Sequence, residues 1–191
     1  GVRLVGSEMC IRDRYGYEGD FELTESSKII YNDTADAGIR EAAWNMQEDL
    51  KEIAGLDLTV EEGNAPASSN DIYIESQTDD TYGVGDEGYL LKTDDEGVHI
   101  YAPTYTGCRY GTITVEQILD QAEDNRTVPK GITRDYPAYE VRGIMLDVAR
   151  TPYRLSQLQD YAKIMLWYKM NEYHLHINDN DNCNTAFASN E

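Results

Sequence analysis

Residues able to take part in chemistry gather at the ends of two apolar segments near the C-terminus. Arg150 closes the run Arg142–Arg150, which reads RGIMLDVAR, and His174 and His176 alternate within the later segment YHLHI. Asp179 lies in the polar sequence directly after that second segment. If both segments are parallel strands of a (β/α)₈ barrel, these residues lie at the carboxyl ends of the strands, where such barrels carry their active sites. The sequence therefore predicts that Arg150 and Asp179 lie where substrate is held.

The sequence between the two segments predicts a helix. Ser156 is the predicted N-cap, and Met170 and Asn171 follow the predicted helix end. Apolar residues at spacings of three and four mark its inner face: Leu158, Tyr161, Ala162, Met165 and Tyr168. Residues 139–191 are thus predicted to form a β-α-β unit, the start of a (β/α)₈ TIM barrel. The continuous apolar run before Arg150 is typical of a parallel strand buried on both faces.

The alternating histidines admit two interpretations. His174 and His176 face the same side of the predicted strand, and paired imidazoles on a barrel strand are able to form half of a metal site. The alternative is a pair of inward-facing histidines that hydrogen-bond beside a sugar or a core group. We favour the second, because no third or fourth ligand stands at metal-site spacing. The run around Asp179 also lacks the glycine and the closing glutamate of an EF-hand calcium loop.

Residues 15–138 predict an α+β domain, a small sheet with helices on one face, in the element order β-α-β-β-β-β-α. The predicted strands are 28–31, 56–60, 71–75, 89–93 and 98–101, and the last two form a hairpin. The first predicted helix is capped by Thr34 or Asp36 and ends at Gly55, and the second starts at Thr114. The adjacent acidic pairs 86–87 and 95–96 are interpreted as solvated turns.

The first 14 residues differ from the rest in composition. GVRLVGSEMCIRDR holds three arginines and two acidic residues in an otherwise acidic chain, and it closely resembles a translated adapter sequence. We interpret residues 1–14 as non-native and exclude them from the fold prediction. The alternative is an ordinary first strand over residues 2–5. Under the first interpretation the true N-terminus, with any signal peptide, is missing.

Net charge and hydropathy exclude several classes of function. The 191 residues carry 16 Lys and Arg against 36 Asp and Glu, a formal net charge of −20. Such a chain repels phosphate, which argues against nucleic acid as a partner. The mean hydropathy of −0.61 and the lack of a long apolar run predict no membrane span. Cys10, Cys108 and Cys183 are too widely spaced to indicate a disulfide framework or a zinc ribbon.

Residues 139–182 resemble the opening of the catalytic domain of glycoside hydrolase family 20, the β-N-acetylhexosaminidases. The family pattern RG-x-M-L-D-x-x-R, followed after a helix by YK-x-N-x-x-H-x-H-x-x-D-[DN], is matched by RGIMLDVAR and YKMNEYHLHINDN in the same order and spacing. The preceding domain is similar to the α/β accessory domain that commonly precedes this barrel, through EGYLLKTDDEGVHIYAPTYTGCRYGTITVEQIL. That accessory domain also occurs ahead of other glycosidase barrels.

The resemblance implies a retaining hydrolase of terminal N-acetylhexosamines in which the acetamido oxygen of the substrate attacks the anomeric carbon. It implies that Arg150 grips ring hydroxyls, since a planar guanidinium suits two vicinal hydroxyls. It assigns His176 to substrate binding and Asp179 to a supporting carboxylate that tunes the catalytic acid. The implied partner is an N-acetylhexosamine-containing oligosaccharide or glycoconjugate, with no cofactor and no metal. We expect a bacterial enzyme that is secreted or held at the cell surface.

The chain also departs from the family pattern. The catalytic Asp-Glu pair is expected after the fourth barrel strand, and the chain stops at Glu191, just past the second. A barrel needs on the order of 250 residues, so we expect an N-terminal fragment that is inactive alone. Thr151 stands where many members have His. Asn180 stands where many have a second Asp, and lacto-N-biosidase-like members resemble this Asn form. Three alternatives stay open: another glycosidase, a non-catalytic glycan-binding module, and a metal-dependent barrel hydrolase using His174 and His176.

Overall fold

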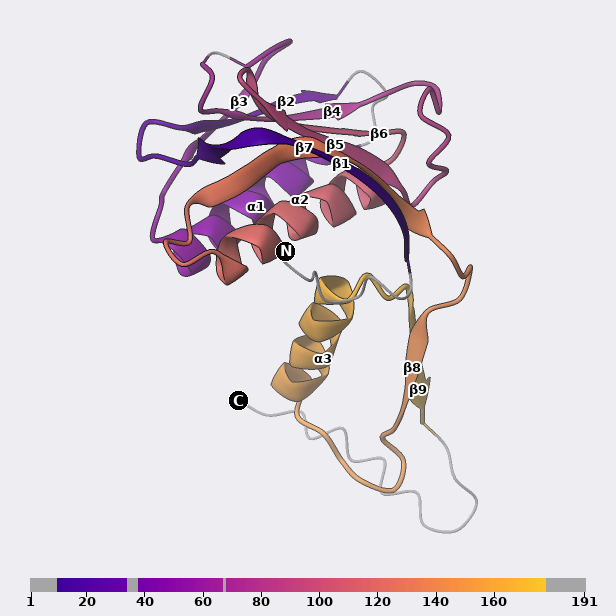
Figure 1. Ribbon diagram of the computed structural model, residues 1–191. Coiled ribbons are helices and arrows are strands. Elements are labelled where there is room, and N and C mark those ends of the chain that lie inside the picture. The colour runs from indigo at the N-terminus through magenta and orange to yellow at the C-terminus, as the bar shows by residue number, and fades with distance from the viewer. Residues whose placement is uncertain (1–9, 34–37, 67, 178–191) are drawn as a thin grey trace. The chain divides into compact units, whose positions relative to one another are not determined.

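The computed structural model describes residues 10–33, 38–66 and 68–177 (Figure 1). The chain divides into two compact units, Gly1–Ala138 and Tyr139–Glu191, and each is described by itself. None of the helices within the described ranges is long and apolar enough to cross a membrane.

The described part of the first unit forms a seven-stranded mixed sheet, in the order β1-β7-β5-β6-β4-β2-β3. Its strands are β1 (Cys10–Glu22), β2 (Lys28–Asp33), β3 (Thr59–Glu62), β4 (Ile72–Ser76), β5 (Tyr89–Asp94), β6 (Gly97–Ala102) and β7 (Thr127–Pro137). The strands β3, β2, β4 and β6 are parallel to one another, whereas β5, β7 and β1 continue the sheet from β6 in antiparallel pairs. The predicted hairpin is confirmed as β5–β6.

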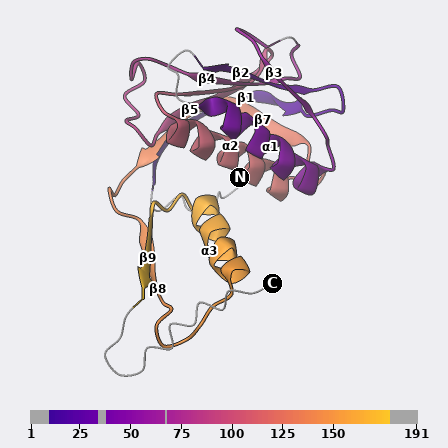
Figure 2. The same cartoon turned by 180° about the vertical axis from the view of Figure 1, so that it is seen from behind.

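Two helices, α1 (Ile39–Ala54) and α2 (Tyr105–Gln121), lie on one face of this sheet (Figures 1 and 2). The predicted apolar stripe of α1 is buried at Ile39, Ala42, Ala43, Met46 and Leu50. Gly55 ends the helix in the left-handed conformation, with φ of 67°, which a residue with a side chain rarely adopts. The predicted α+β class, with helices on one face, is confirmed.

Helix α2 is longer than predicted, and its N-cap lies ten residues earlier. Thr104 is the N-cap, and its hydroxyl accepts a hydrogen bond of 3.1 Å from the Gly107 amide. The prediction that Thr114 caps this helix is therefore wrong. Thr114 lies inside the helix, where its hydroxyl contacts the buried Tyr89 hydroxyl at 2.5 Å. A Cβ atom at Gly111 would lie 2.4 Å from Ile100 Cγ2, so this glycine allows the helix to approach the sheet closely.

The remaining differences concern strands and one cap. The predicted element order lacks β1 and β7, which pair antiparallel from Cys10↔Pro137 to Glu22↔Thr127. Thr34 and Asp36, the predicted caps of α1, lie outside the described residues. The Asp33 carboxylate instead accepts hydrogen bonds of 2.8 and 3.2 Å from the first amides of the helix region. Strand β1 crosses residue 15, and the non-native origin of residues 1–14 stays a prediction.

A buried charge cluster ties α1 to α2. Arg109 Nη2 donates to Asp49 Oδ2 over 2.6 Å, and Arg109 Nη1 donates to Glu116 Oε1 over 2.9 Å. The Glu116 side chain is wholly buried. Burial raises the pKa of Glu116 to about 8, although the Arg109 guanidinium acts in the opposite direction. The cluster joins the two helices by charge as well as by apolar packing.

The second unit is the predicted β-α-β unit: β8 (Gly143–Asp147), α3 (Leu155–Trp167) and β9 (Glu172–His176). The two strands are parallel, with Gly143 beside Glu172 and Asp147 beside His176. Ser156 is not the cap of α3: the N-cap is Arg154, whose amide donates to Gln157 Oε1 over 2.9 Å. Burial of β8 on both faces is not observed within the described residues, where its side chains alternate between exposed and half-buried.

Candidate active site

The carboxyl ends of β8 and β9 lie side by side. The parallel register aligns Asp147 with His176, and the Val148 amide donates to the His176 carbonyl over 3.1 Å. Arg150 follows β8 by three residues, and His176 is the last residue of β9. Both predicted site residues therefore belong to the same edge of the two-stranded sheet. This edge is the one at which parallel α/β folds bind their ligands.

Asp147 holds Arg150 in place. Its Oδ1 accepts hydrogen bonds from the amides of Ala149 at 3.0 Å and Arg150 at 3.2 Å, and its Oδ2 accepts one from Arg150 Nε at 2.5 Å. Hydrogen bonds from the Arg150 amide and side chain, together with the Ala149 amide, hold the pKa of Asp147 below its usual value. The Arg150 side chain is 70% exposed. Arg150 Nη2 also pairs with Asp147 Oδ2, so the carboxylate holds one edge of the guanidinium while most of the side chain stays in solvent.

The sequence prediction gave Asp147 no role, although it lies within the quoted motif. In the apolar run before Arg150 it is the one acidic residue, three positions before an arginine. That spacing is the available signal, because a carboxylate at the end of a strand reaches the amides of the following turn. Asp147 is thus an anchor for the residue that the motif assigns to the sugar.

The two predicted histidines differ in their surroundings. His174 pairs with Met145 across the sheet and is exposed, whereas His176 pairs with Asp147 and is half-buried. Throughout the residues that the structure describes, one group of three His, Cys, Asp or Glu side chains is close enough to hold a metal ion, and it contains neither histidine. Asp179 and Asn180 lie outside the described residues, so the structure does not report on them.

Other residues of the same motif act at the opposite end of the strands. Arg142 is buried, and its side chain donates to the Lys169 carbonyl at 2.8 Å and the Tyr139 carbonyl at 2.7 Å. Asn171 accepts a hydrogen bond of 2.9 Å from the Arg142 amide through its side chain. A Cβ atom at Gly143 would lie 2.6 Å from the Glu172 carbonyl oxygen, so glycine is required there. These residues join the start of β8 to the start of β9 and leave the site to the other end.

The mixed-sheet domain is followed by a parallel β-α-β unit with an anchored arginine at its carboxyl edge. This arrangement is consistent with an accessory domain that precedes a hydrolase barrel. Comparison with protein-family models specifies the family. The model "Glycosyl hydrolase family 20, domain 2" matches residues 15–136. The model "Glycosyl hydrolase family 20, catalytic domain" matches residues 139–187. The chain therefore belongs to glycosyl hydrolase family 20, and the predicted resemblance is confirmed.

Individual relatives agree with this assignment. A β-hexosaminidase of Porphyromonas gingivalis is 32% identical over 186 residues, which cover 94% of this chain and 23% of that protein. A lacto-N-biosidase of Bifidobacterium bifidum is 27% identical over 67% of this chain and 11% of its own length. The chain thus spans about a quarter or less of these relatives.

Solved structures share the fold of the chain. The N-acetyl-β-hexosaminidase of Streptomyces plicatus in complex with Thio-NAglucal aligns with a TM-score of 0.74 at 25% identity. The alignment covers 87% of this chain and 33% of that one. The β-N-acetylhexosaminidase of Bacteroides fragilis aligns with a TM-score of 0.68 at 20% identity, which speaks to the fold alone. The predicted combination of accessory domain and barrel start is therefore confirmed.

Proposed function

We propose that this chain supplies a sugar-binding edge of a retaining β-N-acetylhexosaminidase that removes terminal N-acetylhexosamine from glycans. The observation that carries the proposal is the anchored guanidinium of Arg150 at the carboxyl edge of β8 and β9. Family membership supports it, because the relatives named above are a β-hexosaminidase and a lacto-N-biosidase.

The chemistry of the edge fits a sugar ring. A guanidinium presents donors in a fixed plane, so it is able to bridge two neighbouring hydroxyl oxygens. Asp147 accepts hydrogen bonds from the amides of Ala149 and Arg150 and from Arg150 Nε. The Arg150 side chain is therefore already restrained, and less conformational entropy is lost when a sugar binds. His176, half-buried beside Asp147, is proposed to donate or accept one further hydrogen bond from the same sugar.

Proton transfer and nucleophilic attack are assigned to other groups. In the proposed reaction the substrate acetamido oxygen attacks the anomeric carbon, and an Asp-Glu pair expected after the fourth barrel strand orients that group and protonates the leaving oxygen. Asp179 is proposed to support this acid through a hydrogen-bond chain. The chain contributes binding and orientation, so the 191-residue chain alone is expected to release no chromophore from an aryl N-acetyl-β-glucosaminide.

A chimera tests the proposed roles. In the P. gingivalis β-hexosaminidase, the stretch that aligns with this chain is replaced by this chain, and hydrolysis of the aryl N-acetyl-β-glucosaminide is measured. Arg150→Ala in the chimera is expected to lower kcat/KM roughly 10- to 100-fold, since one or two hydrogen bonds from a charged group are lost. Asp147→Asn is expected to raise KM by a smaller factor, because it loosens Arg150 without removing it.

Arg154→Ala is the matched control, because Arg154 is an exposed arginine of the same unit whose amide and carbonyl make its contacts to the start of α3. It is expected to leave kcat/KM unchanged. A chimera whose kcat/KM responds equally to the loss of Arg150 and of Arg154 would contradict the proposed role of Arg150. A correctly folded chimera without activity would contradict the proposed function itself.

A further inference from the structure

Three side chains with metal-ligating atoms lie together at the tip of the β5–β6 hairpin. Asp94 ends β5, Glu96 lies in the turn, and His99 lies on β6. One nitrogen or carboxylate oxygen from each lies within 4.8 Å of the others. The strand register explains the arrangement: His99 is paired with Lys92, so it shares a sheet face with Lys92 and Asp94. This face is opposite the one that packs on α2, because the neighbouring Ile100 contacts the helix at Gly111.

The imidazole of His99 is the observation that points to a ligand. Its side chain is only 6% exposed, and its Nε2 makes no hydrogen bond to any described residue. This atom lies 3.8 Å from Asp94 Oδ1, on the side where the three groups converge. A buried polar atom without a partner is costly, and natural proteins retain few of them without a reason. A bound cation would supply that partner.

The other atoms around the imidazole are already arranged for such a role. His99 Nδ1 lies 3.3 Å from the Tyr101 hydroxyl, and the two rings are stacked. If Nδ1 donates its proton to this hydroxyl, the lone pair of Nε2 points at the cluster, which is how metal-bound histidines are commonly oriented. Asp94 Oδ1 accepts the Glu96 amide at 2.9 Å, whereas Oδ2 pairs with Lys92 at 2.5 Å. The nearer oxygen of Asp94 is therefore held toward His99.

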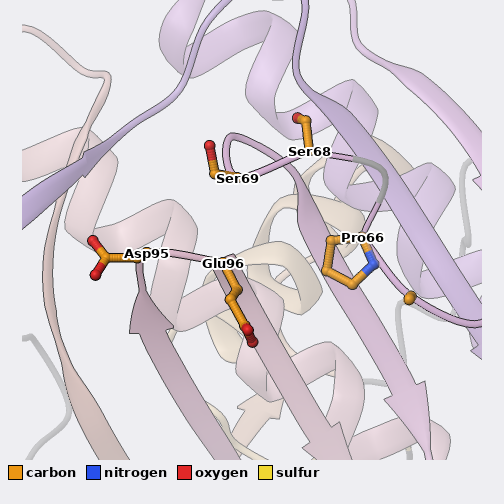
Figure 3. Close-up of a pocket in the computed structure, with 6 residues that line it drawn as sticks. Pro66, Ser68, Ser69, Asp95 and Glu96 are labelled. Carbon is orange, nitrogen blue, oxygen red and sulfur yellow. The ribbon is translucent and has the colours of Figure 1, made fainter.

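Solvent reaches the cluster through Glu96. This exposed residue also lines a cavity of about 410 Å³ together with Asp95, Ala65, Pro66, Ser68 and Ser69. Figure 3 shows that the side chains of Asp95 and Glu96 leave the turn in different directions. Asp95 is 95% exposed and pairs with Lys130 at 2.9 Å. The two adjacent carboxylates, which the sequence analysis treated alike as solvated, therefore differ in what they are able to bind.

We propose that Asp94, Glu96 and His99 form a binding site for a divalent transition-metal ion of the zinc class. One imidazole and two carboxylates are ligands that zinc accepts, whereas calcium and magnesium prefer oxygen atoms alone. Metal–ligand bonds of about 2.0–2.2 Å place neighbouring ligand atoms roughly 3.3–3.6 Å apart, close to the separation between His99 and Asp94. Glu96 is exposed and moves inward to complete the site, which pins the turn to β6.

The test is a titration of the complete 191-residue chain with zinc chloride in an isothermal titration calorimeter. The chain has three histidines, so His174→Gln and His176→Gln leave His99 as the remaining imidazole. Cys10→Ser and Cys183→Ser remove two further zinc ligands, and Cys108 is buried. This background chain is expected to bind one zinc ion. Excess magnesium is expected not to displace it.

Single substitutions in that background locate the ion. Glu96→Gln and His99→Gln are each expected to weaken zinc binding at least roughly ten-fold, as the loss of a ligand should. Asp95→Asn is the matched control, because it removes the same charge from the same turn without touching the cluster, and it is expected to leave the affinity unchanged. Circular dichroism checks each variant for folding. Glu96→Gln keeps the test decisive where His99→Gln disturbs the core, because Glu96 is exposed.

Three results would overturn the proposal. The first is a background chain that shows no saturable zinc binding. The second is binding that a folded Glu96→Gln variant retains at full strength. The third is binding that Asp95→Asn weakens as much as Glu96→Gln does, because that result would mean a diffuse attraction to the acidic chain rather than a site.

Discussion

The two units of the chain bury their apolar side chains to very different degrees. In the first unit Ile39, Met46 and Ile74 are fully buried between the sheet and its helices. In the second unit Met145 on β8 and Ile164 on α3 are 65% and 51% exposed. A domain needs a covered core on every apolar face. The first unit has such a core, whereas the second presents site residues on elements whose apolar faces are suited to pack against further protein.

The same contrast appears in how each unit uses arginine. Arg109 is buried between α1 and α2, where its contacts to Asp49 and Glu116 neutralise charge inside the first unit. Arg150 in the second unit pairs with Asp147 at the surface, and most of its side chain stays in solvent. The first pairing holds a structure together, and the second fixes the direction of a side chain. The following substitutions test whether this difference is real.

The largest effect is expected from removing Arg109. Arg109→Met keeps the aliphatic part of the side chain but leaves Glu116 buried without its cation. At pH 8.5, above the pKa of about 8 of this carboxyl, we expect a cost of about 3–5 kcal/mol of the free energy of unfolding. Urea unfolding, monitored by circular dichroism, measures the change in the free energy of unfolding. The matched substitution Arg150→Met is expected to leave the urea midpoint unchanged, because water replaces the lost contact at the surface. Equal losses from the two substitutions would show that both pairs are structural.

A smaller effect is expected from one isoleucine in each unit. Ile100 is fully buried under α2, so Ile100→Ala removes buried methyl groups and is expected to cost about 2–5 kcal/mol. The exposed Ile164 on α3 is expected to change the free energy of unfolding by less than about 0.5 kcal/mol when replaced by alanine. Urea unfolding of both variants measures the difference.

The chimera with the P. gingivalis β-hexosaminidase sharpens this comparison. If the exposed face of α3 is covered in a complete catalytic domain, Ile164→Ala should lower the melting temperature of the chimera although it leaves the 191-residue chain unchanged. A chimera that tolerates Ile164→Ala equally well would mean that this face of α3 stays in solvent. The melting temperature of Ile100→Ala in the same chimera is the reference for a buried position.

Much of the first unit could be predicted because its periodic pattern is local. The apolar spacing of α1, its closing Gly55 and the β5–β6 hairpin all follow from neighbouring residues. Helix α2 could not be placed correctly, because Gly107 and Gly111 are typical of loops in isolation. Their purpose depends on Gly88 and Ile100, which are distant in sequence and leave no room for a side chain. The pairing of β1 with β7 is likewise a long-range contact without a local signal.

The candidate sites show the same division. Arg150 and His176 could be placed at the strand ends from a motif, but the anchoring by Asp147 required the geometry of the turn. The cluster at the hairpin tip was missed although its signal was present. Once the hairpin is predicted, its register puts His99 opposite Lys92, and therefore on the face of Asp94. Predicted register, and not only predicted strands, is what would have brought these residues together.

The smallest effect is expected from the titration of Glu116, which makes the free energy of unfolding depend on pH. Burial raises the pKa of Glu116 to about 8, whereas in the unfolded chain this carboxyl titrates near 4.5. Between these values the folded state holds a proton that the unfolded state has lost, so stability must fall as pH rises through this range. From pH 6.5 to 7.5 the contribution of Glu116 is a loss on the order of 1 kcal/mol. Urea midpoints of the wild-type chain and of Glu116→Gln measure it as the difference between the two slopes.

The comparison between variants isolates this one carboxyl, because every other titrating group is common to both chains. Glu52→Gln is the matched control, since Glu52 lies exposed on α1 and its removal changes the net charge equally. Its pH slope is expected to equal that of the wild-type chain. If Glu116→Gln also keeps the wild-type slope, Glu116 is ionised in the folded chain throughout this range and Arg109 outweighs burial. The cluster between α1 and α2 would then be a true ion pair, and the loss from Arg109→Met should be as large at pH 6.5 as at pH 8.5.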